Sequence, residues 1–409
     1  MKSRIVIFAM ICGLIPISGW GWMEYYKTCI PNKIQVITGS QSDFDFSLPA
    51  SASIAEGKQQ WTLQEPFSVT AWNSGSYEME VRLFGVIPLK TIQVEAIEET
   101  YVIPCGCPVG IYMETEGIMV IDTGTIVDSQ GVEQAPAGTV LQSGDYIQAV
   151  DGVYITEKEE LIQTIQESQG QSLTLTVKRN QQAIDVLITP VCSKDGDYKA
   201  GIWVRDDMQG IGTLTYVTEE EFGALGHGVN DTDTGELVDF ATGELRNASI
   251  IGITKGESGQ PGSVAGMVDY SEEGYLGSIE SNTECGIAGS IEAFQHLPAD
   301  VSQTFVPVAL KQEVVLGTAY IRSDISGEMK EYEIQITDIH MGSTNATKGL
   351  EIQVTDPELL ELTGGIIQGL SGSPILQNGQ VVGAVTHVLV NDPTRGYGIF
   401  IENMLEHDN

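Results

Sequence analysis

The carboxyl-terminal half of the sequence is a succession of short apolar stretches separated by glycines. From Lys199 onward, stretches such as 211–217, 331–339 and 381–390 alternate apolar and polar residues between turn residues. Alternation of this kind indicates β-strands that are buried on one face. No long helix is predicted between them. Roughly 200 residues built in this way favour a two-barrel or sandwich β domain.

A serine held between glycines stands near the end of this region, where residues 369–374 read GLSGSP. A nucleophilic serine needs a tight turn without bulky neighbours, so that its hydroxyl projects while backbone amides point at the developing oxyanion. We therefore predict that Ser371 is the nucleophile of a trypsin-like peptidase and that the amides of Gly369 and Ser371 form the oxyanion hole. Gly372 is expected to let the substrate carbonyl approach. The alternative is a simple Gly/Ser-rich hairpin, because six residues can match by chance.

The general base must come from only five histidines, which are His227, His296, His340, His387 and His407. His227 follows an apolar run and lies between two glycines, a setting that places an imidazole at a cleft rather than in a core. It is our first choice. His387 lies in the strand expected after the serine and is the main rival.

The third member of such a site is a carboxylate that fixes the imidazole tautomer. Spacing leaves several aspartates open, namely Asp231, Asp233, Asp239, Asp356 and Asp392. Asp356 closes a predicted strand fifteen positions before Ser371 and could reach the same cleft. The spacing does not single it out.

Residues 105–191 have a different pattern, with several short strands and one amphipathic helix expected at 157–168. This order resembles a PDZ domain, in which a peptide adds as a strand beside the helix and its end is held by a loop of backbone amides. By position, Val109, Gly110 and Ile111 would form that loop, although the sequence there departs from the usual glycine pattern. The alternative is a half-barrel that only packs on its neighbour.

The amino terminus has the composition of a membrane-targeting segment. Lys2 and Arg4 precede an uncharged apolar run over 5–17, which is typical of an export signal. The apolar stretch can be extended to Met23, close to the ~20 residues that a spanning helix needs. We expect an uncleaved anchor rather than a cleaved signal, and an exported remainder.

Charge and cysteine content exclude several other functions. Twenty basic and 56 acidic residues give a formal charge of −36, which disfavours nucleic acid as a partner. Cys105 and Cys107 form a C-x-C pair without a second pair or a nearby histidine, so no zinc site is expected. We expect no metal and no cofactor.

Four segments together resemble the stage IV sporulation protein B peptidases. They read GALGH at 223–227, VTDP at 354–357, GGIIQGLSGSPI at 364–375 and GAVTH at 383–387, and FGVIPLK at 84–90 adds to them. The resemblance implies a catalytic triad of His227, Asp356 and Ser371.

The same resemblance implies a signalling serine endopeptidase of spore formation, located in the space between the two membranes of the developing spore. There it would cut itself and a membrane-bound inhibitor complex, and so trigger intramembrane processing of a late sigma factor. Two alternatives are an exported quality-control protease with PDZ domains, in which the peptidase comes first, and a non-catalytic PDZ adaptor.

The expected chain is thus mainly β and has four parts. These are a signal peptide or membrane anchor at 1–27, a β-rich region of unknown function at 28–102, a PDZ-like α+β domain at 103–195, and a trypsin-like double-β-barrel peptidase domain at 196–409.

Overall fold

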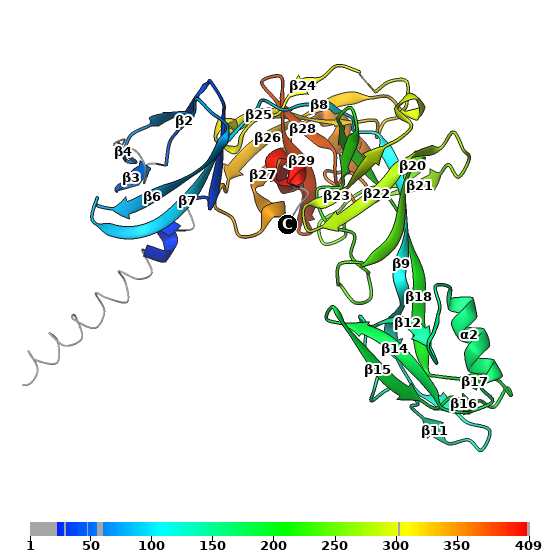
Figure 1. Cartoon of the computed structure of the whole chain (residues 1–409). Coiled ribbons are helices and arrows are strands. Elements are labelled where there is room, and N and C mark those ends of the chain that lie inside the picture. The colour runs from blue at the N-terminus through cyan, green and yellow to red at the C-terminus, as the bar shows by residue number, and fades with distance from the viewer. Residues whose placement is uncertain (1–22, 28–29, 47, 55–59, 302, 407–409) are drawn as a thin grey trace, which may run out of the picture.

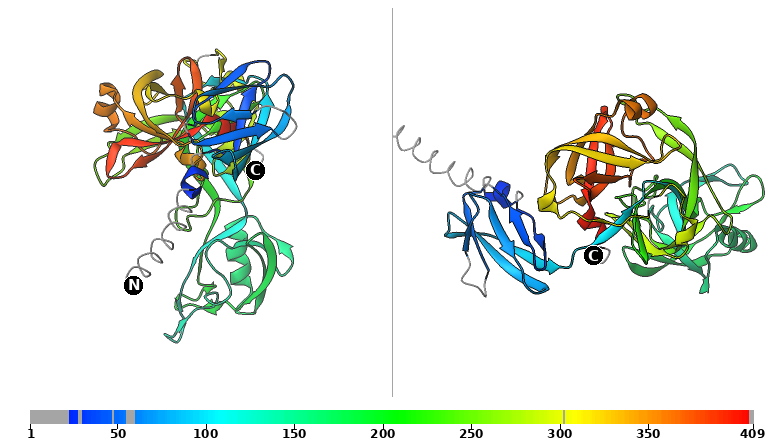
Figure 2. Two further views of the ribbon diagram at one scale, coloured as in Figure 1. Left: turned by 90° about the vertical axis from the view of Figure 1, so that its left-hand side faces the viewer. Right: turned by 90° about the horizontal axis from the view of Figure 1, so that it is seen from above.

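The computed structural model describes residues 23–406 apart from 28–29, 47, 55–59 and 302. The chain is mainly β, as predicted, with a sandwich at the amino-terminal side, two closed rings of strands in the centre and a projecting lobe (Figures 1 and 2). Among the described residues no helix is long and apolar enough to cross a membrane. The predicted anchor lies almost wholly outside the described residues.

Seven strands form the amino-terminal sandwich. Its larger sheet has the order β1-β7-β6-β3-β4, and β2 pairs with β5. Both sheets contribute to one core, in which the rings of Phe44 and Phe67 stack with centroids 5.5 Å apart. The bounds are β1 Lys33–Ile37, β2 Gln41–Phe44, β3 Ala50–Ile54, β4 Gln60–Thr62, β5 Phe67–Thr70, β6 Gly75–Leu83 and β7 Ile87–Ile97.

The carboxyl-terminal ring is a closed barrel with the strand order β25-β26-β27-β30-β29-β28. Its alternating side chains fill the interior, including Ile321, Ile334 and Ile352. We call it the second ring. The bounds are β25 Gly317–Ser323, β26 Lys330–Ile339, β27 Leu350–Val354, β28 Pro374–Gln377, β29 Gln380–Leu389 and β30 Asp392–Phe400, with the helices α3 Pro357–Thr363 and α4 Ile401–Leu405 at its ends.

Six other strands close what we call the first ring. Each pairs with the next in the order β9-β18-β19-β23-β22-β20, and β20 returns to β9. The core of this ring contains Val109, Leu214, Phe222 and Leu245. The bounds are β9 Pro108–Thr123, β18 Ile202–Val217, β19 Glu221–Ala224, β20 Phe240–Thr254, β22 Tyr275–Thr283 and β23 Gly286–Ile291, with β8 Tyr101–Pro104, β21 Ser263–Val268 and β24 Val306–Pro307 beside them.

The lobe is inserted into the first ring. Strands β9 and β18 are each 16 residues long, and one half of each belongs to the ring while the other half continues into the lobe. The lobe has its own core, which includes Ile147, Leu161 and Val177. Its elements are β10 Ile126–Val127, β11 Glu133–Gln134, β12 Tyr146–Val150, β13 Val153–Tyr154, α2 Lys158–Glu167, β14 Leu173–Arg179, β15 Gln182–Ile188, β16 Val191–Cys192 and β17 Tyr198–Lys199.

This insertion corrects the predicted boundary between a PDZ-like domain at 103–195 and a peptidase domain at 196–409. Residues 108–115 pair with β20 in the first ring, so the lobe interrupts the ring rather than precedes it. The sequence hides the junction because the strand pattern of β9 runs from ring to lobe in one element. Likewise, the strand expected at 211–217 is only the carboxyl-terminal part of β18, which begins at Ile202.

The predicted carboxylate loop of Val109, Gly110 and Ile111 is also wrong. These residues lie in β9 and pair with β18 on one side and β20 on the other. Val109 is 0% and Ile111 5% exposed. Their backbone groups are engaged within the sheet and cannot hold a peptide terminus.

Candidate active site

Ser371 and His227 lie on the wall of one cavity between the two rings. The cavity has a volume of about 690 Å³, and Gly369 and His387 also line it. None of its lining residues is Asp, Glu, Lys or Arg. The structure therefore brings together the predicted nucleophile, both candidate bases and both predicted oxyanion-hole residues.

The serine turn depends on its two glycines. Gly369 and Gly372 have φ values of 107° and 95°, in the region that favours glycine. A Cβ on Gly372 would lie 2.3 Å from the carbonyl oxygen of Thr213 and 2.6 Å from the amide nitrogen of Leu225. Gly372 is thus required for packing against the first ring, and the expectation that it lets the substrate carbonyl approach stays a prediction.

Two threonines of β18 hold the serine turn from the opposite ring. Thr213 Oγ1 donates to the carbonyl of Gly369 at 2.6 Å, and Thr215 Oγ1 donates to the carbonyl of Gly372 at 2.7 Å. Both threonines are buried. Sequence reasoning missed them, because these contacts join residues more than 150 positions apart.

The amides of the serine turn fall into two groups. Those of Leu370, Gly372 and Ser373 donate to the carbonyls of Ile367, Val385 and Leu370 at 3.1, 2.8 and 3.0 Å. Within the part of the chain that the structure describes, the amides of Gly369 and Ser371 have no acceptor. Because both residues line the cavity, these two amides are available to an oxyanion there.

His227 is presented by a tight turn at the end of β19. Leu225 and Gly226 both have positive φ, 72° and 69°, which reverses the chain just before the imidazole. The His227 Nδ1 atom lies 2.9 Å from the carbonyl oxygen of Gly228. Since a carbonyl can only accept, Nδ1 carries the proton in this contact, and neutral His227 keeps a lone pair on Nε2.

His387 lies beside His227, with ring centroids 5.3 Å apart. Desolvation of the imidazole, with His227 and Lys348 nearby, lowers the pKa of His387 to about 4. A general base works best when its pKa is near the working pH. His387 is therefore the weaker candidate for that role.

The serine hydroxyl is not directed at an imidazole in this structure. Ser371 Oγ donates to the carbonyl of Thr386 at 2.6 Å. Thr386 is itself fixed, because its own hydroxyl donates to the carbonyl of Thr347 at 2.7 Å. Ser371 must rotate away from this carbonyl before it can pass its proton to a histidine.

Asp356 is not brought to the cavity. It is the N-cap of α3, where its Oδ1 accepts from the amide of Leu359 at 3.0 Å. The sequence contained this signal, because aspartate followed by proline is typical of a helix start. Its place in a catalytic triad stays a prediction.

The other candidate carboxylates are engaged elsewhere. Asp231 is fully buried and ion-paired with Arg205, which also binds Asp233 at 3.0 Å. Asp239 pairs with Lys178 at 3.0 Å, and Asp392 accepts from the hydroxyl of Thr394 at 2.6 Å. No carboxylate of the described residues lines the cavity.

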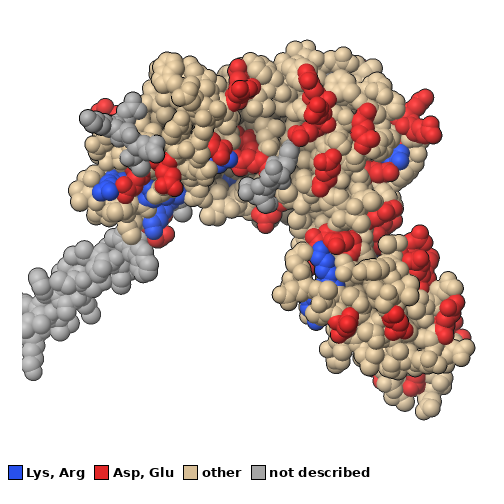
Figure 3. All heavy atoms as spheres, viewed as in Figure 1, with Lys and Arg blue, Asp and Glu red and all other residues tan. Residues whose placement is uncertain are grey.

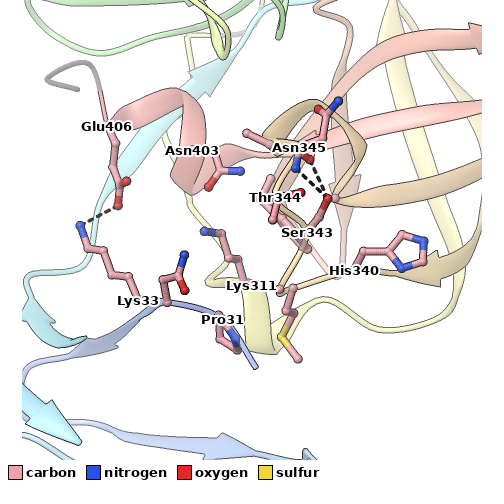
Figure 4. A pocket seen from close by; sticks show the side chains of 15 residues that line it. Pro31, Lys33, Lys311, His340, Ser343, Thr344, Asn345, Asn403 and Glu406 are labelled. Atoms are coloured by element: carbon pink, nitrogen blue, oxygen red, sulfur yellow. Dashed lines mark hydrogen bonds and ion pairs between the residues drawn. The ribbon is translucent and has the colours of Figure 1, made fainter. Parts of the chain in front are cut away.

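A smaller pocket of about 160 Å³ lies where the sandwich meets the second ring (Figure 4). Its two lysines are ion-paired, Lys33 with Glu95 and Glu406 at 2.7 Å each and Lys311 with Glu402 at 3.4 Å. The Lys33–Glu406 pair attaches the sandwich to the residue that follows α4, and the three pairs leave neither lysine as an unpaired cation.

Possible metal ligands lie outside the cavity. Among the described residues, the ligand atoms of Asp338, His340 and Glu351 lie within 4.8 Å of one another on the second ring. Arg395 already binds Glu351 at 3.1 Å. Cys105 and Cys107 are free and fully buried, and burial raises the pKa of the Cys105 thiol to about 12.

Comparison with known proteins assigns this chain to a family. None of the curated proteins matches the chain. Among solved structures, PDZ domains of SdrC-like proteins from Listeria monocytogenes and Listeria innocua match with 24% and 23% identity and a TM-score of 0.19 each; both matches cover 22% of this chain, and 87% and 93% of the respective domains. The model of the family described as SpoIVB peptidase S55 matches residues 196–405. This match spans just over half of the sequence and includes Ser371 and His227, so the chain belongs to the SpoIVB peptidase S55 family and carries a serine peptidase domain.

Proposed function

We propose that the protein is a serine endopeptidase in which the two rings act as a trypsin-like double barrel. Ser371 attacks the peptide carbonyl, His227 is the base, and the amides of Gly369 and Ser371 stabilise the oxyanion. The observation that carries this proposal is that one cavity is lined by the serine, the histidine and two residues whose amides have no acceptor among the described residues.

The proton follows a short path in this mechanism. The hydroxyl of Ser371 turns from the Thr386 carbonyl and gives its proton to Nε2 of His227 as Oγ bonds to the substrate carbon. The carbonyl of Gly228 holds Nδ1–H and so keeps the ring in the orientation that a base needs. His227 then returns the proton to the leaving amine, and water repeats the sequence to release the acyl group.

The cavity wall favours apolar substrate side chains. The lining includes Ile366 and Ile367, which precede the serine turn, and Val388 and Val390, which follow His387. No lining carboxylate is present to select lysine or arginine. We infer that the preferred peptide has an apolar residue next to the scissile bond.

Family membership supports a proposal for the biological role. We propose that the protein is exported, acts in the space between the two membranes of a developing spore, and cuts itself and a membrane-associated regulatory protein. That cut would trigger intramembrane processing of a late sigma factor. The inserted lobe, whose helix and strand order are those expected of a PDZ domain, would select the peptide segments to be cut.

A fluorophosphonate probe tests the catalytic part of the proposal. Wild-type protein should be labelled and should hydrolyse peptides with an apolar residue at the cut, whereas Ser371→Ala should do neither. Ser373→Ala is the matched control, because Ser373 is fully buried two positions away and its hydroxyl has no partner among the described residues. Labelling that survives Ser371→Ala would exclude Ser371 as the nucleophile.

A further inference from the structure

The hairpin that joins β6 and β7 exposes three apolar side chains at its tip. Phe84, Val86 and Ile87 are 68%, 72% and 48% exposed around a turn in which Phe84 and Gly85 have positive φ. We call these three residues the hairpin tip. Clustered apolar groups of this size in water indicate a contact surface rather than a folding requirement.

The hairpin tip lies at the end of the sandwich where the chain enters from the amino terminus. Lys90, three residues beyond Ile87 on β7, donates to the carbonyl of Lys27 at 3.1 Å and to that of Ile30. Three residues of a strand span roughly 10 Å. The tip is therefore close to the residues that directly follow the apolar amino-terminal segment.

The opposite end of the sandwich leads to the rings. Strand β1 runs parallel to β7, from Lys33 beside Gln93 to Ile37 beside Ile97, and the chain leaves after Ile97 toward β8. With 11 residues, β7 is about 35 Å long. The sandwich thus separates the hairpin tip from the start of the first ring along its long axis (Figure 1).

The charge around the tip differs from that of the whole chain. Residues 82–94 contain Arg82 and Lys90 but no Asp or Glu, in a sequence with 56 acidic and 20 basic residues. The nearby carboxylate of Glu80 is ion-paired with Arg82 at 2.9 Å. Figure 3 shows Lys and Arg interspersed with Asp and Glu on the lower part of the sandwich, whereas Asp and Glu dominate the rings on this face. An acid-free apolar tip can approach an anionic lipid surface that would repel the rest of the protein.

We propose that the hairpin tip inserts into the surface of a lipid bilayer. Lys27 lies at this same end, and the sequence before it has basic residues and an uncharged run over 5–17. This order commits the tip to a membrane rather than to another protein. Insertion of this kind reaches only the headgroup and upper acyl region, typically about 5–10 Å deep. The proposal rests on the exported, membrane-associated part of the proposed function, and not on the catalytic part.

This contact gives residues 28–102 a mechanical role. An anchor alone would leave the sandwich free to pivot, whereas an anchor and a second contact fix its orientation. The sandwich then acts as a spacer that holds the peptidase cavity at a set height above the membrane. A peptidase held in this way reaches a membrane-bound substrate only at a matching distance from the bilayer.

Site-specific fluorescence in proteoliposomes tests the proposal. The full-length protein is prepared with an environment-sensitive fluorescent amino acid at Val86, or at Val153 as a matched control, which is a valine 68% exposed on the β12–β13 hairpin of the lobe. Both are reconstituted into vesicles of phosphatidylcholine and phosphatidylglycerol that carry headgroup nitroxide lipids. We expect a blue-shifted emission and several-fold stronger quenching at Val86 than at Val153.

Equal quenching at the two positions, with water-like emission at Val86, would overturn the proposal. The hairpin tip would then be interpreted as a binding surface for another protein. A probe at Ile87 repeats the measurement if the Val86 variant fails to fold. Peptide hydrolysis by the same proteoliposomes separates the two proposals. An active sample with a water-exposed tip would overturn only the membrane contact, whereas a quenched tip in an inactive sample would count only against the peptidase mechanism.

Discussion

The two rings have the same number of strands but are built differently. The second ring is formed by one uninterrupted stretch, 317–400, whereas the first ring uses strands on both sides of an inserted lobe. Ser371 comes from the second ring and His227 from the first. The nucleophile therefore stands on a locally folded unit, while the base depends on strands far apart in the sequence and on the docking of the two rings.

The contacts between the two rings also join residues that are far apart in the sequence. Thr213 and Thr215 reach from β18 to the serine turn, and Gly106 O accepts from the amide of Asp324 at 3.3 Å. Contacts of high sequence separation form late and at an entropic cost. We expect the cavity to be assembled only when both rings are complete.

The largest expected effect distinguishes the histidines of the two rings. His227→Ala should lower peptide hydrolysis by several orders of magnitude, because it removes the base. His387→Ala should have a much smaller effect, since the depressed pKa of His387 makes it a poor base. Rates of hydrolysis of an apolar peptide measure both. A greater loss in His387→Ala would assign the base to the second ring.

Two deletions test whether the lobe is an insertion in the first ring. Replacing residues 117–204 by a short glycine turn should leave a folded peptidase, because Thr115 Oγ1 already donates to the carbonyl of Asp206 at 3.0 Å and Arg205 is kept as the partner of the buried Asp231. Deleting 105–191 instead removes the half of β9 that closes the ring, and should prevent folding. Circular dichroism and fluorophosphonate labelling report both results. A folded, active 105–191 deletion would contradict the ring.

Asp356 allows a smaller test in the second ring. Asp356→Ala should destabilise the protein by about 1 kcal/mol through loss of the α3 cap, whereas Asp356→Asn should be nearly neutral because asparagine caps helices equally well. Denaturant unfolding measures both free energies. If Asp356→Asn unfolds normally but no longer cleaves peptides, the carboxylate has a catalytic role that this conformation does not display.

An effect of similar size, but confined to neutral pH, is expected for a carboxyl group where the two rings meet. Burial, with Asp300 nearby, raises the pKa of Asp324 to about 6. A raised pKa means that the stability contributed by the protonated group is present below about pH 4 and is lost as the pH rises through about 6.

Asp324→Asn should therefore raise the free energy of unfolding at pH 7 by about 1 kcal/mol, allowing for solvent screening, and change it little below pH 4. Asp195→Asn is the control, because that side chain is 80% exposed. Denaturant unfolding at pH 7 and below pH 4 measures the free energy of unfolding of both variants. An equal effect of Asp324→Asn at both would show that its charge is not the cause.

Local pattern was sufficient for much of this molecule. The mainly β fold, the helix at 158–167 and the strands of the second ring follow from short-range alternation and turn residues. The sequence pattern did not reveal that β9 belongs to both the first ring and the lobe. The strand passes from one to the other near Thr115, and no break in hydrophobicity occurs there. The pattern also misplaced Val109 to Ile111, whose apolar sequence suits a buried strand as well as a binding loop.

The sequence by itself determined the chemistry that is available: a serine on a glycine turn, few histidines, an apolar amino terminus and an acidic surface. These are properties of residue type and of neighbours along the chain. Only the tertiary structure decided which groups meet. It brought His227 to the cavity of Ser371, left the amides of Gly369 and Ser371 free, and made Asp356 a helix cap. The reason is that the cavity lies between two closed rings, and ring closure joins residues whose separation no local pattern records.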